Sequence, residues 1–158
     1  MNIALIGYGK MGKTIEAIAV ANGHTIGLKI DQDNAADLCE QKVAGIDVAI
    51  EFTGPQSAFE NVINCLSLGL PVVCGSTGWL EKYDEAKRFC EAKNGTFIYA
   101  SNFSIGVNLF FEINKTLAKL MSKHSNYDVS LHEIHHTQKK DAPSGTAITL
   151  AEQVMEVL

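Results

Sequence analysis

The residues best suited to chemistry gather in one short run, residues 133–147, which reads EIHHTQKKDAPSGTA. Four of the five histidines lie between positions 124 and 136, and Lys139 follows at the distance of a loop. Ser144, Gly145 and Thr146 begin a predicted helix, whose open N–H groups form a seat for an anion. A cation, imidazoles and a helix N-terminus can therefore converge on a negatively charged substrate. In a chain of net charge −5, this local concentration is needed to draw in a dicarboxylate.

The histidines have separate predicted roles, and other interpretations of them stay open. At the end of a predicted strand, the adjacent His135 and His136 point to opposite faces. Together with His132 they can instead be zinc ligands, although no cysteine lies at a usual zinc spacing, or they can have no function. Cys74 can be a nucleophile, but a cysteine that ends an apolar strand is more often a core residue.

A second chemical signal lies near the start of the chain, where GYGKMG at residues 7–12 matches the pattern GxGxxG. It follows a predicted strand and opens a predicted helix. Gly7 permits the tight turn, Gly9 lets the backbone approach a pyrophosphate, and Gly12 allows close packing of the helix on the strand. This context predicts a dinucleotide site, and the alternative is a glycine turn with a structural role alone.

Two charged residues bear on the choice of dinucleotide. Asp31, 19 residues after Gly12, ends the next predicted strand and is placed to accept hydrogen bonds from the adenosine ribose. Its charge repels a 2′-phosphate, which favours NADH. Lys10 is the opposing signal, because a cation in the glycine turn can reach a 2′-phosphate, and NADPH stays the second candidate. Asp31 can also be an ordinary solvated residue at a strand end.

The elements that must position these residues alternate along the first hundred residues. Short apolar runs predict strands at residues 2–6, 25–30, 47–52, 71–74 and 96–100, and helical patterns follow most of them. Strands that are apolar on both faces are typical of a parallel sheet covered on both sides. We therefore predict an α/β fold, a doubly wound Rossmann-type sheet that makes residues 1–104 a dinucleotide-binding domain.

Residues 105–158 are predicted to hold a linking helix and the start of an α+β domain for substrate binding and assembly. The helix covers about residues 107–123, and residues 128–137 alternate apolar and polar side chains as a strand does. The material after this segment is short for a complete second domain.

The loops after three of the strands should face the cofactor, because ligands of parallel sheets bind beyond the carboxyl ends of the strands. These loops follow Phe52, Cys74 and Ala100. Residues 75–78 can approach the nicotinamide closely, or they can be an ordinary strand-to-helix turn. Trp79, the only tryptophan, follows this loop, so its emission should respond to NADH.

Composition narrows the class of protein. The 13 basic and 18 acidic side chains lack the positive excess of a nucleic-acid binder. The four cysteines form no CxxC pair and fit reduced thiols in a cytoplasmic protein. Neither a signal peptide nor an apolar run of about 20 residues is present, so we expect no membrane partner, and we expect no metal.

The run at residues 133–147 closely resembles the signature of the dihydrodipicolinate reductase family, EhHHxxKxDAPSGTA. The glycine turn, Glu51-Phe52-Thr53, residues 75–78 and residues 101–104 resemble further segments of that family in the same order. The resemblance implies an enzyme of diaminopimelate and lysine biosynthesis. Such an enzyme transfers a hydride from NAD(P)H to C4 of the cyclic dicarboxylate 4-hydroxy-tetrahydrodipicolinate and gives tetrahydrodipicolinate.

The resemblance also implies roles for individual residues. His135 matches the family's proton donor, and Lys139 matches its partner in acid catalysis and carboxylate binding. The matches to substrate-binding positions are His136, Ser144, Gly145 and Thr146. The matches to cofactor contacts are Gly7, Gly9, Lys10, Met11, Gly12, Asp31, Thr53, Gly75, Ser76, Thr77, Ala100, Ser101, Asn102 and Phe103.

Two departures from the family affect what we expect. Lys10 stands where many members have arginine, which replaces a planar fork by a point charge and weakens the case for NADPH. Family members also continue past the SGTA helix and complete a mixed sheet used for tetramer assembly. We therefore expect a truncated form that keeps the cofactor fold but lacks a closed substrate site and the family's homotetramer. A non-catalytic NAD(H)-binding fragment or sensor, or a different nicotinamide oxidoreductase of small anionic substrates, are the alternatives.

Overall fold

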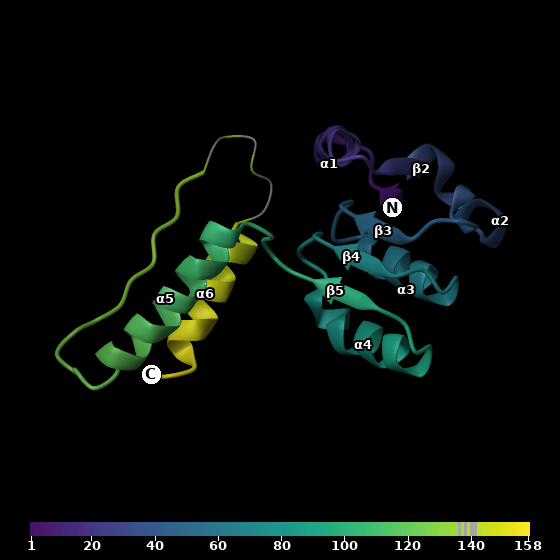
Figure 1. Cartoon of the computed structure of the whole chain (residues 1–158). Helices are drawn as coiled ribbons and strands as arrows, with labels where there is room; N and C mark the ends of the chain where they lie inside the picture. Colours follow the sequence, from purple (N-terminus) through teal and green to yellow (C-terminus); the bar gives the residue numbers. More distant parts are fainter. Residues whose placement is uncertain (136, 138, 140–141) are drawn as a thin grey trace. The chain divides into compact units, whose positions relative to one another are not determined.

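The computed structural model describes residues 1–135, 137, 139 and 142–158. The chain divides into two compact units, Met1–Ala100 and Ser101–Leu158, and the division lies four residues before the predicted end of the first domain. The first unit carries the five strands, and the second carries two helices, α5 and α6 (Figure 1).

The five strands of the first unit form one parallel sheet in the order β2-β1-β3-β4-β5. Their bounds are Asn2–Ile6 for β1, Thr25–Ile30 for β2, Val48–Glu51 for β3, Val72–Cys74 for β4 and Phe97–Tyr99 for β5. The chain turns back at β1, because β2 lies on one side of it and β3 on the other. This reversal is the doubly wound arrangement, so the predicted fold class is confirmed.

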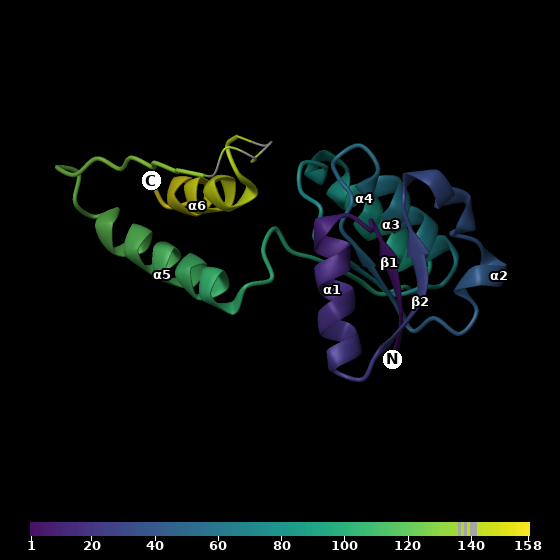
Figure 2. The same cartoon turned by 90° about the horizontal axis from the view of Figure 1, so that it is seen from above.

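Apolar side chains cover both faces of the sheet, because successive residues of a strand point to opposite faces. Ala4 and Ile6 of β1 join the larger core cluster, and Ile3 and Leu5 join the smaller one. Helix α1 (Lys10–Ala21) covers the smaller cluster, whereas α3 (Ala58–Ser67) and α4 (Tyr83–Ala92) cover the larger (Figure 2). The glycine turn and the polar loops therefore emerge from a rigid, two-sided core.

Three short helical segments had no clear signal in the sequence. They are the 3-10 helices η1 (Gln32–Asp37) and η2 (Leu80–Lys82) and the single-turn helix α2 (Glu40–Val43). Local hydrogen bonds hold η1, where the Asp31 side chain accepts from the Gln32 N–H at 2.9 Å and the Asn34 side chain accepts from the Asp31 N–H at 2.7 Å. These contacts form a capping box, which depends on only four residues and not on hydrophobic periodicity.

The second unit packs α5 (Ile105–Met121) against α6 (Gly145–Met155). Asn114 of α5 donates to the Leu150 carbonyl at 3.1 Å and to the Gln153 side chain at 3.0 Å. The hydroxyls of Ser104 and Ser144 cap the two helices by accepting from N–H groups of their first turns.

The strand predicted at residues 128–137 is wrong for the part that the structure describes. Residues 128–135 carry no strand, and the side chains of Val129 and Ile134 are 61% and 96% exposed. A strand needs a neighbour for its N–H and C=O groups, and no described residue of the second unit forms one. The alternating pattern is present, but it is not matched by a pairing partner.

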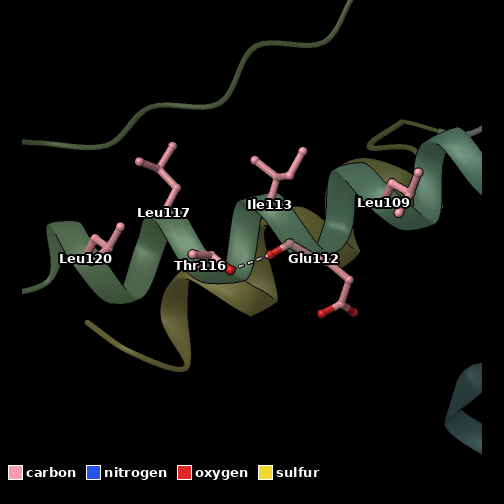
Figure 3. A pocket seen from close by; sticks show the side chains of 6 residues that line it. All are labelled: Leu109, Glu112, Ile113, Thr116, Leu117 and Leu120. Atoms are coloured by element: carbon pink, nitrogen blue, oxygen red, sulfur yellow. Dashed lines mark hydrogen bonds between the residues drawn. The ribbon is translucent and has the colours of Figure 1, made fainter.

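One side of α5 exposes a row of large apolar residues. Leu109, Ile113, Leu117 and Leu120 follow one another at helical spacing and are 55% to 62% exposed (Figure 3). Beside this apolar row, the Thr116 hydroxyl donates to the Glu112 carbonyl at 2.9 Å, as the dashed line in Figure 3 shows. None of the helices in the described part of the chain is both long and apolar enough to cross a membrane.

Candidate functional site

The segments predicted to bind a dinucleotide all leave the sheet at one edge. Ile6 pairs with both Ile30 and Glu51, Glu51 pairs with Cys74, and Cys74 pairs with Tyr99, so the last residues of the strands stand in register. The residues that follow these strand ends are Gly7, Asp31, Phe52, Gly75 and Ala100. The carboxyl edge of the sheet therefore brings the five predicted cofactor segments of the first unit side by side.

The glycine turn fits the close approach of a phosphate at one position and packs tightly at two others. A Cβ on Gly7 (φ 95°) would lie 2.2 Å from the Phe52 carbonyl oxygen, and one on Gly12 would lie 2.2 Å from the Gly7 carbonyl oxygen. A Cβ on Gly9, in contrast, would meet nothing within 4 Å. Gly7 and Gly12 are thus required by the fold, whereas Gly9 leaves the backbone open.

The open backbone coincides with the start of α1. Gly9 is its N-cap, no side chain caps the helix, and Lys10 and Met11 follow as exposed residues of the first turn. A helix N-terminus presents unpaired N–H groups and the positive end of the helix dipole. These residues therefore fit a dinucleotide pyrophosphate, which binds through backbone N–H groups at such a turn.

A cluster that the sequence analysis did not find braces this turn. Lys29 of β2 forms an ion pair with Glu16 of α1 at 2.7 Å, donates to the Tyr8 hydroxyl at 3.1 Å and lies 4.6 Å from the centre of the Tyr8 ring. Tyr8 in turn donates to Glu16. The hydrogen bond with Lys29, and then that with Tyr8, lowers the pKa of Glu16, and the Glu16 partner raises the pKa of Lys29. Tyr8, the second residue of the turn, is thereby tied to both α1 and β2.

Asp31 lies at the same edge as an exposed carboxylate in a fixed orientation. Its backbone and side chain are both held by the cap of η1 described above. Asp31 is therefore a solvated residue at a strand end whose carboxylate is held in one orientation, and its contact with an adenosine ribose stays a prediction.

The loops after β3 and β4 are joined through hydroxyl groups. The Thr53 N–H donates to the Ser76 hydroxyl at 2.8 Å, and Ser76 is only 6% exposed. Gly75 packs on Phe52, because a Cβ placed there would lie 2.1 Å from the Phe52 ring. Thr53 is exposed and Thr77 is half-buried, so these two predicted cofactor residues are the more accessible ones.

Trp79 lies beneath the loop after β4 and not at the surface. Its indole N–H donates to the Ser76 carbonyl at 2.8 Å, and its side chain is 4% exposed. The aromatic rings around it are those of Phe59, Tyr83, Phe97 and Tyr99. Any effect of NADH on its emission must therefore pass through the loop.

The predicted contacts at residues 100–103 cross the division between the units. Ala100 is the last residue of the first unit, and Ser101 is the first residue of the second. Within the second unit, the Asn102 carbonyl accepts from the Asn108 side chain at 3.0 Å, and the Asn102 side chain accepts from the Ser104 N–H at 2.8 Å. The first turn of α5 thus fixes Asn102, and the neighbouring Phe103 is exposed.

The second unit brings together three residues of the run at 133–147. The His135 Nε2 lies 2.8 Å from one carboxylate oxygen of Glu133, and the Ser144 N–H donates to the other at 2.9 Å. Hydrogen bonding by Ser144, and secondly by His135, lowers the pKa of Glu133 to about 2. An ionised Glu133 therefore orients the His135 imidazole beside the start of α6.

The other predicted substrate residues lie nearby in the sequence. Gly145 and Thr146 form the half-buried start of α6, and Lys139 is half-buried. His136 lies outside the described residues. Sequence analysis missed the role of Glu133, although its spacing of two residues from His135 places both side chains on one side of an extended chain.

Of the two alternative sites named from the sequence, the cysteine nucleophile is contradicted, whereas the zinc site includes His136, which lies outside the described residues. Cys74 is fully buried and donates its S–H to Glu51 at 3.0 Å, and burial raises the pKa of its thiol, so it is a core residue and not a nucleophile. Within residues 1–135, 137, 139 and 142–158, no group of three or more histidine, cysteine or acidic side chains is arranged to hold a metal.

Comparison with known proteins decides the family. The family model described as "Dihydrodipicolinate reductase, N-terminus" matches residues 1–103, and the one described as "Dihydrodipicolinate reductase, C-terminus" matches residues 106–157. The chain belongs to the dihydrodipicolinate reductase family. The resemblance predicted from the run at 133–147 and from the glycine turn is therefore confirmed.

Individual members of the dihydrodipicolinate reductase family agree with this assignment. A protein of Christiangramia forsetii named 4-hydroxy-tetrahydrodipicolinate reductase is 52% identical over 157 residues, which cover 99% of this chain and 64% of the relative. A protein of the same name from Chromobacterium violaceum is 34% identical, and the match covers 99% of this chain and 66% of the relative. The chain thus spans about two thirds of the length of these relatives.

Solved structures agree as well. A dipicolinate-bound dihydrodipicolinate reductase from Paenisporosarcina sp. TG-14 is 28% identical, with a TM-score of 0.75, and the match covers 99% of this chain and 66% of that chain. An NAD-binding protein from Listeria innocua is 18% identical, with a TM-score of 0.52 over 78% of this chain, and shares the fold alone.

Proposed function

We propose that this chain carries the cofactor site and the acid-catalytic residues of a 4-hydroxy-tetrahydrodipicolinate reductase. The proposed reaction adds a hydride to C4 of the cyclic dicarboxylate and a proton to its 4-hydroxyl, which leaves as water, and it gives tetrahydrodipicolinate. The proposal is supported by the register of the strand ends, because the segments that follow them leave the sheet at one edge in a member of the dihydrodipicolinate reductase family.

The first unit would bind and orient the cofactor, which supplies the hydride when bound. The N–H groups at Gly9, Lys10 and Met11 would hold the pyrophosphate at the start of α1. Asp31 would accept from the adenosine ribose. The nicotinamide half would lie along the loops after β3 and β4, where Thr53 is exposed and Thr77 is half-buried, and Ser101, Asn102 and Phe103 are included from the family resemblance alone.

In the second unit, the proposed work is to hold a dicarboxylate and deliver a proton. His135 would be the proton donor, because Glu133 holds its imidazole in one orientation at 2.8 Å. The start of α6 at Ser144, Gly145 and Thr146 would bind one carboxylate, and Lys139 would assist His135 in acid catalysis and bind a substrate carboxylate. His136 is included as a substrate-binding residue from the family signature alone.

The test is NADH oxidation by the purified chain, with the substrate generated in place from pyruvate and aspartate semialdehyde by the preceding synthase. Turnover would support the proposed reductase, and His135→Ala and Lys139→Ala should then each abolish it while NADH binding stays unchanged. Fully active variants would refute the assigned roles. NADH binding without turnover by the unmodified chain would favour the alternative, a non-catalytic NAD(H)-binding module.

Three finer features remain predictions of the same proposal. Titrations with both nucleotides should show tighter binding of NADH than of NADPH, because Asp31 repels a 2′-phosphate and Lys10 is a single point charge. The location is predicted to be cytoplasmic. Size-exclusion chromatography with light scattering should show no stable homotetramer, and a stable tetramer would contradict that prediction.

A further inference from the structure

We propose that Glu51 is a positioning residue that holds the loops after β3 and β4 in the arrangement that receives the nicotinamide half of the cofactor. The inference rests on the proposed function, since it assumes that this edge of the sheet binds a dinucleotide. Glu51 is fully buried and is itself not one of the residues predicted to contact the cofactor. It acts through Thr53 and Ser76, two of the predicted cofactor residues.

Glu51 is a carboxylate with no exposed surface at the end of β3. One of its oxygens accepts from the Thr53 N–H at 3.0 Å, from the Thr53 hydroxyl and from the Asn61 amide at 3.5 Å. The other oxygen accepts from the Cys74 thiol at 3.0 Å. A buried carboxylate is costly unless donors surround it, so this number of donors marks a built arrangement and not a chance burial.

The contacts of Glu51 link two loops that follow different strands. The Thr53 N–H that donates to Glu51 also donates to the Ser76 hydroxyl, and the Gly75 N–H donates to the Glu51 carbonyl at 2.9 Å. Asn61, from α3, donates to the Thr53 hydroxyl at 3.2 Å as well. The Glu51 side chain therefore ties Thr53 to the end of β4 at Cys74, and the Thr53 N–H extends this link to Ser76.

The chemistry of these partners explains why the residue is acidic. The groups that face the Glu51 side chain in these contacts are a backbone N–H, a hydroxyl, a side-chain amide and a thiol, all of which donate. A carboxylate accepts on both oxygens and brings no donor of its own. Glutamine keeps the shape and one acceptor oxygen. Methionine keeps most of the volume but removes both acceptors, so the Thr53 hydroxyl loses its acceptor and the Thr53 N–H keeps only the Ser76 hydroxyl.

The location of the network predicts a selective effect on one half of the cofactor. The glycine turn and Asp31, which would bind the adenosine diphosphate half, make no contact with Glu51 among the interactions described above. Thr53 and Ser76 lie on the nicotinamide side of the edge. Loss of the network should therefore weaken NADH binding and spare the binding of ADP-ribose, which lacks the nicotinamide.

The experiment measures the dissociation constants of NADH and ADP-ribose by calorimetry for the full chain and four variants. For Glu51→Met we expect NADH to bind about tenfold more weakly and ADP-ribose to bind within about twofold of the unmodified chain. Glu51→Gln should restore NADH binding to within about threefold. Val62→Ala removes apolar volume from the larger core cluster, which also contains Cys74. It is the control for general loss of stability and should leave the ratio of the two dissociation constants unchanged.

Each outcome bears on a separate claim. Equal weakening of both ligands by Glu51→Met, or no weakening of either, would overturn the positioning role. If Glu51→Met does not fold, Asn61→Ala removes one donor to Thr53 from a half-buried position and should weaken NADH about twofold to threefold with ADP-ribose unchanged; an unchanged ratio there would also overturn the role. Failure of the unmodified chain to bind NADH would overturn the proposed function together with the inference.

Discussion

Two substitutions that each add one methyl group to the glycine turn, Gly9→Ala and Gly12→Ala, should separate effects on cofactor binding from effects on stability. Gly9 and Gly12 both belong to the GxGxxG pattern, but their surroundings differ. A Cβ on Gly9 would meet nothing within 4 Å, whereas a Cβ on Gly12 would lie 2.2 Å from the Gly7 carbonyl oxygen. Gly9→Ala should therefore weaken ligand binding, whereas Gly12→Ala should lower the stability of the fold.

The expected loss of stability follows from these distances. The contact at Gly12 is more than 1 Å shorter than an ordinary contact and involves backbone, so we take the upper end of the overpacking range, about 3 kcal/mol. Gly9 is the N-cap of α1 with φ −78°, which alanine can adopt, and alanine at an N-cap costs at most about 1 kcal/mol more than glycine. At about 4 °C per kcal/mol, the Tm should fall by about 12 °C for Gly12→Ala and by at most about 4 °C for Gly9→Ala.

Thermal unfolding and NADH titration by calorimetry together check this prediction. Gly9→Ala should stay folded and bind NADH at least about tenfold more weakly, because its methyl group fills the space through which a pyrophosphate reaches the N–H groups of α1. Gly106→Ala is the control, since its Cβ meets only the Ser104 hydroxyl at 3.8 Å. A stable Gly9→Ala variant with unchanged NADH affinity would refute the proposed position of the pyrophosphate. Equal losses of Tm in Gly9→Ala and Gly12→Ala would refute the argument from the different Cβ distances at the two glycines.

Three further predictions concern groups with shifted pKa values or a buried fluorophore. The pKa of Glu133 in the folded chain, about 2, lies below the ordinary value of 4.5, so the contribution of Glu133 to stability is present above pH 4.5 and is lost as the pH falls toward 2. The difference in Tm between the unmodified chain and Glu133→Gln should therefore shrink over that range. A constant difference in Tm would contradict this prediction. Burial raises the pKa of Cys65 to about 12 and raises that of Cys74, so Ellman's reagent at pH 8 should modify only the other two cysteines of the native chain, and four fast thiols would contradict this. NADH should quench the emission of Trp79 through its hydrogen bond to the Ser76 carbonyl, and unchanged emission at saturating NADH would count against that link.

Much of the first unit was predictable because its signals are local. Apolar runs bounded by glycine and polar residues predicted all five strands to within one residue at each end. The glycine turn was equally clear, since spacing alone predicts a strand, a tight turn and a helix. The 3-10 helix after Asp31 was not predicted, because its capping box involves four residues and leaves no periodic pattern.

The residues that support the candidate site were harder to predict, because their roles depend on contacts distant in the sequence. Glu51 accepts from the Cys74 thiol only because β3 pairs with β4, and it is linked to Ser76 only through Thr53. Glu133 meets Ser144 across 11 positions of the chain. A single acidic residue at the end of an apolar strand gives no sign of the donors that the fold will bring to it.

The division between the units limits where this polypeptide can be cut or recombined. A fragment that ends at Ala100 keeps every strand but loses Ser101, Asn102 and Phe103. A junction after Ser104 keeps those residues but separates Asn102 from the Asn108 side chain that holds its carbonyl. A chimera that exchanges the second unit for that of another protein should therefore carry an asparagine at position 108 of the incoming helix, because otherwise the segment predicted to contact the cofactor loses the hydrogen bond to its Asn102 carbonyl.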